Sequence, residues 1–148
     1  MALTVADIRT YIKDQPDLNI LLEGDYQSSD ALIGLSMRLA MSDVNATPPV
    51  TAYTVESFPN ELIMLYGTLH HLANSEAERQ LRNQINYSAQ GLNAGIDDKM
   101  QSYNALAAYY RSLFDSKTKE YKVYLNTEAA WGGSSSPYES LTEHEFRS

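Results

Sequence analysis

The chain has 148 residues, the size of one ordinary domain, and it contains no cysteine, which excludes disulfide frameworks, thiolate nucleophiles and cysteine-based zinc sites. Its net charge of −8 favours solubility and argues against nucleic-acid binding, which needs clustered Lys and Arg. The N-terminal residues lack the pattern of a secretory signal, and no apolar run reaches the roughly 18 residues of a membrane span. We therefore expect a soluble protein, made in a cytosol.

The first predicted helix runs from about Val5 to Asp14. Thr4 can cap its N-terminus, and Asp7 stands three residues later, as a capping box requires. Pro16 follows closely, and the residue before a proline is disfavoured in the α region, so we expect the helix to end there. The apolar stripe of this helix consists of Val5, Ile8 and Ile12.

The second predicted helix begins after Ser28-Ser29 and continues to about Val44. Gly34 lies within it and costs about 1 kcal/mol of helix stability relative to alanine. We therefore expect another helix to approach closely at Gly34. Pro48-Pro49 follows as a stiff connection. Apolar residues that recur with the helical period predict a core-facing stripe made of Leu32, Ile33, Leu35, Met37 and Leu39.

Ser57 is the predicted cap of a third helix, with Pro59 in its first turn, where a missing N–H costs nothing. This helix is expected to extend to Leu81 or Gln84. The pattern breaks over 85–97, which predicts a loop or a weak hairpin. The apolar side of the helix is made of Leu62, Leu65, Tyr66, Leu69, Leu72 and Ala73.

The last predicted helix, Asp97 to Asn126, has the clearest apolar periodicity in the chain. Its roughly 29 residues give a rod on the order of 43 Å, which is too long for a compact four-helix domain of this size. We therefore expect its end to meet a neighbouring subunit. The expected core residues are Tyr103, Leu106, Tyr110, Leu113 and Phe114, the expected subunit contacts are Tyr121, Tyr124 and Leu125, and the lysines suited to its C-terminal dipole are Lys117, Lys119 and Lys122.

The composition changes after this helix, where glycines and serines dominate residues 132–136. The sequence therefore predicts a mainly α protein, with a bundle of about four helices over 1–130 and a flexible, extended C-terminal arm over 131–148. The spaced hydrophobic residues of the arm are typical of anchors that order on a partner, although a frayed tail has the same composition. The predicted anchors are Trp131, Pro137, Tyr138, Leu141 and Phe146.

The sequence offers no support for catalysis, a metal or a cofactor. His70 and His71 are neighbours about 100° apart on a helix, so they cannot share a metal as an i, i+4 pair does, and we expect helix-surface histidines. Asp97-Asp98 lacks the later glutamate of an EF-hand loop, and no lysine follows the glycines of 91–95 as a phosphate loop requires. We therefore predict a protein that is not an enzyme and binds neither metal nor cofactor.

The order of the segments resembles a known family. A helix opening at Leu3-Thr4-Val5-Ala6-Asp7-Ile8-Arg9 closes at Pro16-Asp17-Leu18-Asn19, and the next ends at Asn45-Ala46-Thr47-Pro48-Pro49. Phe58-Pro59 introduces the third helix, and a long tyrosine-rich helix ends in Ala129-Ala130-Trp131-Gly132. This arrangement, over most of the chain, is similar to that of the head–tail adaptor (connector) proteins of tailed bacteriophages.

The resemblance implies a virion structural protein, made in the host cytoplasm and located in the neck, at the head–tail interface. In that family a small helical bundle forms a closed homo-oligomeric ring, usually of about twelve copies, beneath the portal. The C-terminal arm docks on the portal, which would make the arm anchors portal-binding residues. The opposite face receives the next neck or tail component, and the lumen passes DNA without specific binding and without contact with a membrane.

Two other classes of function stay open. One is a different phage role, as a neck, tail-completion or baseplate subunit, which shares the same composition. The other is a non-viral helical regulator or chaperone that binds its partner through the C-terminal arm. The mass of the particle in solution discriminates them, since a large ring favours the adaptor and a stable monomer or dimer favours the regulator.

Overall fold

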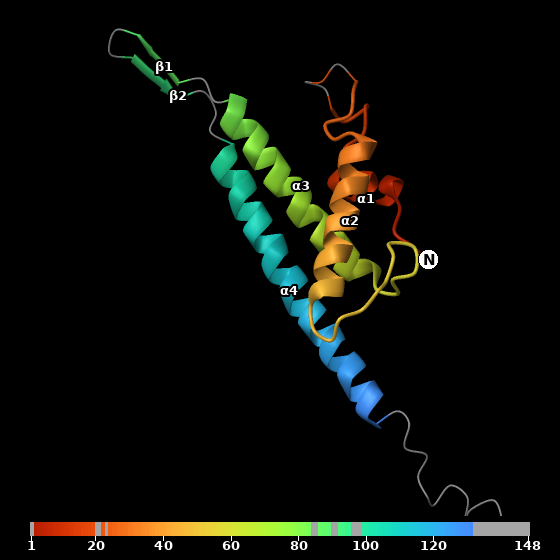
Figure 1. The fold of residues 1–148 in the computed structure, drawn as a ribbon. Coiled ribbons are helices and arrows are strands. Elements are labelled where there is room, and N and C mark those ends of the chain that lie inside the picture. Colours follow the sequence, from red (N-terminus) through yellow and green to blue (C-terminus); the bar gives the residue numbers. More distant parts are fainter. Residues whose placement is uncertain are drawn as a thin grey trace, which may run out of the picture.

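The computed structural model describes residues 2–19, 22, 24–83, 86–89, 92–95 and 99–131. Over these residues the chain has four helices and one antiparallel hairpin (Figure 1), and the expectation of a mainly helical bundle with a long last helix is confirmed. The elements are α1 (Val5–Ile12), α2 (Asp30–Ala46), α3 (Glu61–Asn83), β1 (Asn86–Ala89), β2 (Leu92–Gly95) and α4 (Met100–Trp131).

Helices α3 and α4 form a long antiparallel pair, and the β1–β2 hairpin lies beyond the end that they share (Figure 1). Helix α2 packs against α3, and α1 against α2. The 23 residues of α3 span about 35 Å, whereas the 32 residues of α4 span about 48 Å. The C-terminal turns of α4 therefore run past the other helices. Within the described ranges, no helix combines the length and apolar character that crossing a membrane requires.

Helix α1 begins as the sequence predicts and ends earlier. The capping box is present, because the Asp7 amide donates to the Thr4 hydroxyl (3.2 Å) and the Thr4 amide donates to the Asp7 carboxylate (2.8 Å). The helix stops at Ile12, since Lys13 adopts the left-handed conformation with φ of 57°. The predicted end at Asp14 was therefore wrong, and Asp14 is the first residue of the loop that follows the turn.

Helix α2 begins as predicted, with the Ser29 hydroxyl accepting a hydrogen bond from the Leu32 amide (3.2 Å). Its core face agrees with the predicted stripe only in part. Leu35 and Leu39 are 43% and 42% exposed, so their assignment to the core was wrong. Ile33 and Met37 are buried as predicted. The small residues Ser36 and Ala40 are also buried, and periodicity weighted by large side chains misses them. The buried residues of α2 are Ile33, Ser36, Met37, Ala40, Met41 and Val44.

The close helix approach occurs at Gly67 of α3, and its prediction at Gly34 was wrong. A Cβ at Gly34 would meet no atom within 4 Å. A Cβ at Gly67 would lie 2.7 Å from the Ala40 Cβ and 2.7 Å from a Phe114 ring carbon. Helices α2, α3 and α4 therefore converge at this glycine.

The start of α3 lies later than predicted. Asn60 caps it by accepting a hydrogen bond from the Ile63 amide (3.2 Å), whereas Ser57 belongs to a preceding turn, where its hydroxyl accepts from the Thr54 amide (2.9 Å). Leu62 is 44% exposed, which corrects its assignment to the apolar side. The hairpin after α3 confirms one of the two predicted alternatives. Of the predicted α3 stripe, the buried members are Leu69, Leu72 and Ala73.

The buried face of α4 also differs from the prediction, by one residue along the helix. Leu106 is 40% exposed, and its neighbour Ala107 is buried instead. The His70 ring reaches the Ala107 carbonyl oxygen at 3.0 Å, so α3 crosses closely at this small residue. Phe114 is buried as expected. The other three predicted core residues are partly buried: Tyr103, Tyr110 and Leu113.

Lys122 is a buried lysine that serves a different role from the one predicted. Its side chain packs inside, and the ammonium group donates to the Pro49 carbonyl and to the Thr51 hydroxyl, both at 2.8 Å. Burial lowers the pKa of Lys122. The lysine thus ties the connection between α2 and α3 to α4, rather than serving the dipole of α4 from its surface.

Candidate interaction surfaces

The predicted subunit-contact residues on α4 divide between the interior and the surface. Tyr121 contacts Phe58 edge-on, with ring centroids 5.4 Å apart, and its hydroxyl donates to the Tyr53 hydroxyl at 3.2 Å. Burial and this hydrogen bond raise the pKa of Tyr121 to about 12. Leu125 is half-buried. Tyr121 therefore contributes to packing within the chain, and its contact with a neighbouring subunit stays a prediction.

The last turns of α4 expose large apolar side chains. Val123 is 55% exposed, Tyr124 57% and Trp131 74%, and we call these three residues the α4 tip. The negative charge of Glu128 raises the pKa of Tyr124, with a hydrogen bond between them adding to the shift. Trp131 is the last residue of the helix, one residue into the range predicted for the arm. The other predicted anchors lie outside the described residues: Pro137, Tyr138, Leu141 and Phe146.

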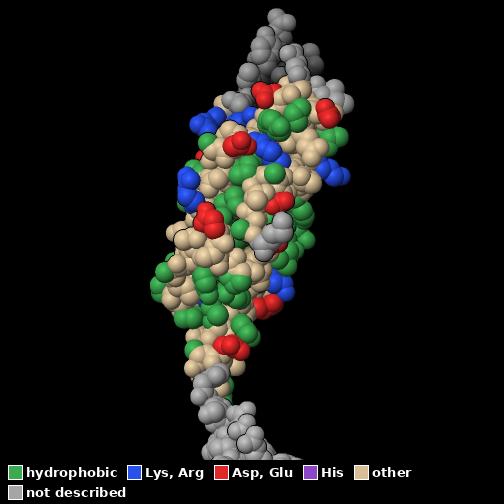
Figure 2. Space-filling view, turned by 90° about the vertical axis from the view of Figure 1, so that its right-hand side faces the viewer, with side chains coloured by type: hydrophobic (Ala, Val, Ile, Leu, Met, Phe, Trp, Pro, Cys, Tyr) green, Lys and Arg blue, Asp and Glu red, His purple; other side chains and the backbone are tan. Residues whose placement is uncertain are grey.

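A second exposed apolar surface lies on α2. Leu35 and Leu39 are one turn apart on the same side of the helix, and we call this pair the α2 ridge. Figure 2 shows one face of the molecule, on which hydrophobic side chains gather in the lower half and charged side chains in the upper half. The surface thus carries apolar areas that the fold itself leaves uncovered.

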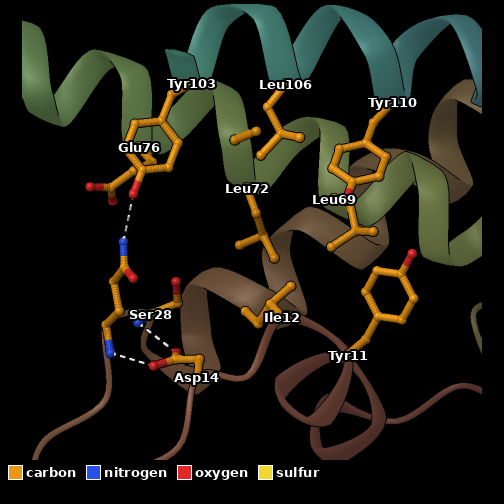
Figure 3. A pocket seen from close by; sticks show the side chains of 12 residues that line it. Tyr11, Ile12, Asp14, Ser28, Leu69, Leu72, Glu76, Tyr103, Leu106 and Tyr110 are labelled. Carbon is orange, nitrogen blue, oxygen red and sulfur yellow. Dashed lines mark hydrogen bonds between the residues drawn. The ribbon is translucent and has the colours of Figure 1, made fainter. Parts of the chain in front are cut away.

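A cleft opens between α1 and α4, over α3 (Figure 3). Its cavity has a volume of about 370 Å³, which is within the range of pockets that bind ligands or side chains of partners. Leu69, Leu72 and Ala73 of α3 form its floor. Tyr11 and Ile12 line one wall, Tyr103, Leu106 and Tyr110 line the other, and the polar rim consists of Asp14, Gln27, Ser28 and Glu76.

Two polar contacts bridge the walls of the cleft. The Gln27 side-chain amide donates to the Tyr103 hydroxyl at 3.3 Å, which links the loop after α1 to α4. Tyr11 and Tyr110 face each other farther along (Figure 3). Burial raises the pKa of Tyr110, and the neighbouring Tyr11 raises it further. These contacts join opposite walls of the cleft above its floor of buried leucines.

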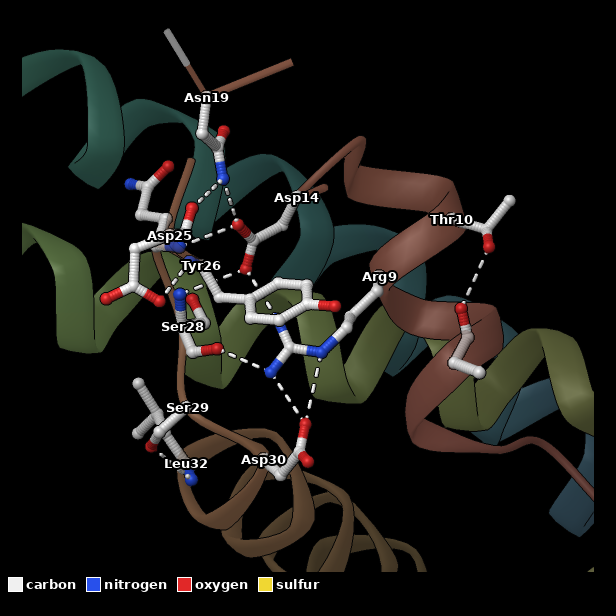
Figure 4. A network of polar contacts seen from close by, with 12 residues as sticks. Arg9, Thr10, Asp14, Asn19, Asp25, Tyr26, Ser28, Ser29, Asp30 and Leu32 are labelled. Carbon is white, nitrogen blue, oxygen red and sulfur yellow. Dashed lines mark hydrogen bonds and ion pairs between the residues drawn. The ribbon is translucent and has the colours of Figure 1, made fainter. Parts of the chain in front are cut away.

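Asp14 fixes the loop that forms the α1 side of the cleft (Figure 4). Its buried carboxylate accepts hydrogen bonds from the Gln27 amide (2.7 Å), the Ser28 amide (2.9 Å) and the Asn19 side chain (2.7 Å). Burial alone would raise the pKa of Asp14, but these hydrogen bonds and the charge of Arg9 outweigh it and hold the pKa below its usual value. Asp14 is therefore ionised at neutral pH and works as the hub of the loop.

Arg9 completes this network. Its guanidinium donates to the Asp14 carboxylate (2.9 Å), to the Ser28 carbonyl (2.7 Å) and to the Asp30 carboxylate (2.6 Å), and it lies over the Tyr26 ring at 4.1 Å. One side chain of α1 thus joins the loop to the first residue of α2. Neither Arg9 nor Asp14 was predicted from the sequence, because the contacts that join the loop to α1 and α2 span 13 to 21 residues and leave no periodic signal.

His70 and His71 bridge helices, which corrects their description as surface residues. His70 reaches the α4 backbone, and the His71 ring contacts the Asp43 carboxylate of α2 at 3.3 Å. Burial and repulsion from His70 lower the pKa of His71, although Asp43 acts in the opposite direction. Among the residues that the structure describes, no three His, Asp or Glu side chains gather as a metal site.

Comparison of the chain with protein-family models, with curated proteins and with solved structures gave no match.

Proposed function

We propose that this protein is a virion structural subunit, a head-to-tail adaptor that forms a ring and joins the portal of a tailed bacteriophage to the next neck or tail component. The α4 tip is the observation that carries the proposal. Helix α4 is about 13 Å longer than α3, the helix on which it packs. Its last turns expose Val123, Tyr124 and Trp131. A helix end of this kind gains stability when a neighbouring subunit covers it.

A closed ring needs two different surface patches on each subunit, one for each neighbour. The α2 ridge and the α4 tip are two such patches on different helices, and each presents large apolar side chains. We propose that the α4 tip of one copy packs on the α2 ridge of the next. The net charge of −8 agrees with a lumen that passes DNA without retaining it.

Two aspartate variants test the ring. Leu39→Asp damages the α2 ridge and Tyr124→Asp damages the α4 tip, and each residue is exposed enough for the subunit to remain folded. The full chain should form rings visible by electron microscopy, and each variant alone should be monomeric by native mass spectrometry. An equimolar mixture should form one-to-one pairs, because one intact ridge and one intact tip remain.

A variant that still self-associates alone would point to a symmetric contact and contradict the ring. A full chain that is a stable monomer and binds a non-phage partner would favour the helical regulator instead. The position of the ring in a phage particle separates an adaptor from a tail-completion or baseplate subunit.

A further inference from the structure

The cleft between α1 and α4 has the chemistry of a receptor for one large apolar side chain beside a cation. Its floor of Leu69, Leu72 and Ala73 is apolar. Glu76 stands at the rim, and its ion pair with Arg79 (2.7 Å) and its hydrogen bond from Gln80 both use one carboxylate oxygen, Oε1. Within the described ranges the other oxygen, Oε2, accepts no hydrogen bond. A segment with an aromatic residue next to an arginine would satisfy both features.

The chain itself contains such a segment. Phe146 is followed by Arg147, whereas Tyr138 is followed by a glutamate and Leu141 by a threonine. Residues 132–148 lie outside the described part of the chain, and α4 ends at Trp131. Each of these side chains would have to turn back along α4 to reach the cleft from that point.

Chain length selects Phe146. The carboxylate end of the cleft lies beside Tyr103 (Figure 3), which stands 28 residues before Trp131 on α4, or about 42 Å along the helix. An extended chain covers at most about 3.6 Å per residue, so Tyr138 reaches about 25 Å from Trp131 and Leu141 about 36 Å. Phe146 reaches about 54 Å, enough for the chain to turn back along α4.

We propose that Phe146 of the same chain inserts into this cleft in the free subunit, with Arg147 paired to the Glu76 carboxylate. Gly132-Gly133 supplies the reversal of direction. Because the segment is tethered, its local concentration at the cleft is on the order of millimolar, so a weak contact suffices. The C-terminal segment is thereby held against its own subunit until a partner competes for it. This inference does not rest on the adaptor role.

The absence of cysteine allows a direct test by disulfide formation. Leu106→Cys places a thiol in the cleft, and Glu145→Cys places one beside Phe146 without removing the aromatic ring or the arginine. The matched control combines Leu35→Cys with Glu145→Cys, since Leu35 has nearly the same exposure as Leu106 (43% against 40%) and lies on the α2 ridge. Both variants are oxidised at low protein concentration, and the products are identified by intact mass.

The Leu106→Cys pair should close an intramolecular disulfide at least about tenfold faster than the Leu35→Cys pair. Adding Phe146→Ser should reduce the rate to that of the control, and adding Glu76→Gln should reduce it in part. Equal rates for the two pairs, or rates that Phe146→Ser leaves unchanged, would overturn the proposal. Disulfide-linked dimers in place of closed monomers would also overturn it, since the segment would then occupy the cleft of a second copy.

Discussion

The two faces of α3 are packed in opposite ways. On one face Gly67 lets α2 and α4 approach so closely that a Cβ would lie 2.7 Å from its neighbours. On the opposite face, about 140–200° around the helix, Leu69 and Leu72 face a cavity of about 370 Å³ between α1 and α4. The same helix therefore closes one side of the bundle and leaves the other open.

This difference assigns stability and binding to different faces. The closed face buries Phe114 and the alanines around it, so packing density supports it. The open face adds polar links to its buried leucines, chiefly the Asp14 hub and the hydrogen bond from Gln27 to Tyr103. Substitutions should therefore change global stability on the closed face and the geometry of the cleft on the open face.

Truncation of Phe114 should have the largest effect. Phe114→Ala removes a ring that is 2% exposed, and it should lower the free energy of unfolding by about 3–5 kcal/mol. Leu106→Ala, on the cleft side, should cost less than about 1.5 kcal/mol, because its side chain is already 40% exposed. Urea unfolding with unchanged m-values measures both. Equal losses would show that the cleft is packed as tightly as the closed face.

The two helical glycines should respond with opposite signs. Gly67→Ala places a Cβ against Ala40 and the Phe114 ring, both of which are buried, so we expect a loss of about 1–3 kcal/mol. Gly34→Ala meets open space and should gain about 0.5–1 kcal/mol from helix propensity. Thermal melts of the matched pair measure the difference. A stabilised Gly67→Ala would contradict the close approach of the three helices.

Local signals predicted the fold well. The Thr4–Asp7 box, the Ser29 cap and the periodicity of α4 each involve residues within a few positions of one another, and each is found in the structure. The wrong predictions concern which of two neighbouring residues on a helix faces the core. Leu39 and Leu106 are exposed because the smaller Ala40 and Ala107 occupy the points where helices cross, and side-chain size alone does not indicate a crossing.

The cleft was not predictable in the same way. Its walls come from α1, the loop after it, α3 and α4, and the bridge from Gln27 to Tyr103 joins residues 76 positions apart. The hub residue Asp14 was assigned to a helix end, because its hydrogen bonds with the amides of Gln27 and Ser28 leave no local pattern. Only the three-dimensional arrangement of these segments reveals the cleft.

Asp14→Asn should weaken the open face by about 1–2 kcal/mol at pH 7, since one backbone amide would face the donor side of the new amide group. The effect should depend on pH. The pKa of Asp14 is lower in the folded state than in the unfolded chain, where it is about 3.9, so its stabilisation is present above that pH and is lost as the pH falls through the folded-state value. The difference in unfolding free energy between the two proteins should therefore be full at pH 6 and should shrink as the pH falls below about 3.9. A constant difference across this range would contradict the role of the charge.

The smallest expected effect concerns the turn that places Asp14. Lys13 adopts φ of 57°, a conformation that costs a residue with a Cβ about 1–2 kcal/mol, whereas glycine adopts it freely. Lys13→Gly removes this cost but increases the conformational freedom of the unfolded chain, so we expect a net gain of about 0.5 kcal/mol. Gly24, with φ of 85° in the same loop, is the matched control, and Gly24→Ala should lose about 1 kcal/mol. Thermal unfolding measures the stability change of both variants. A destabilised Lys13→Gly would mean that the lysine side chain, rather than the left-handed turn alone, holds the α1 wall of the cleft in place.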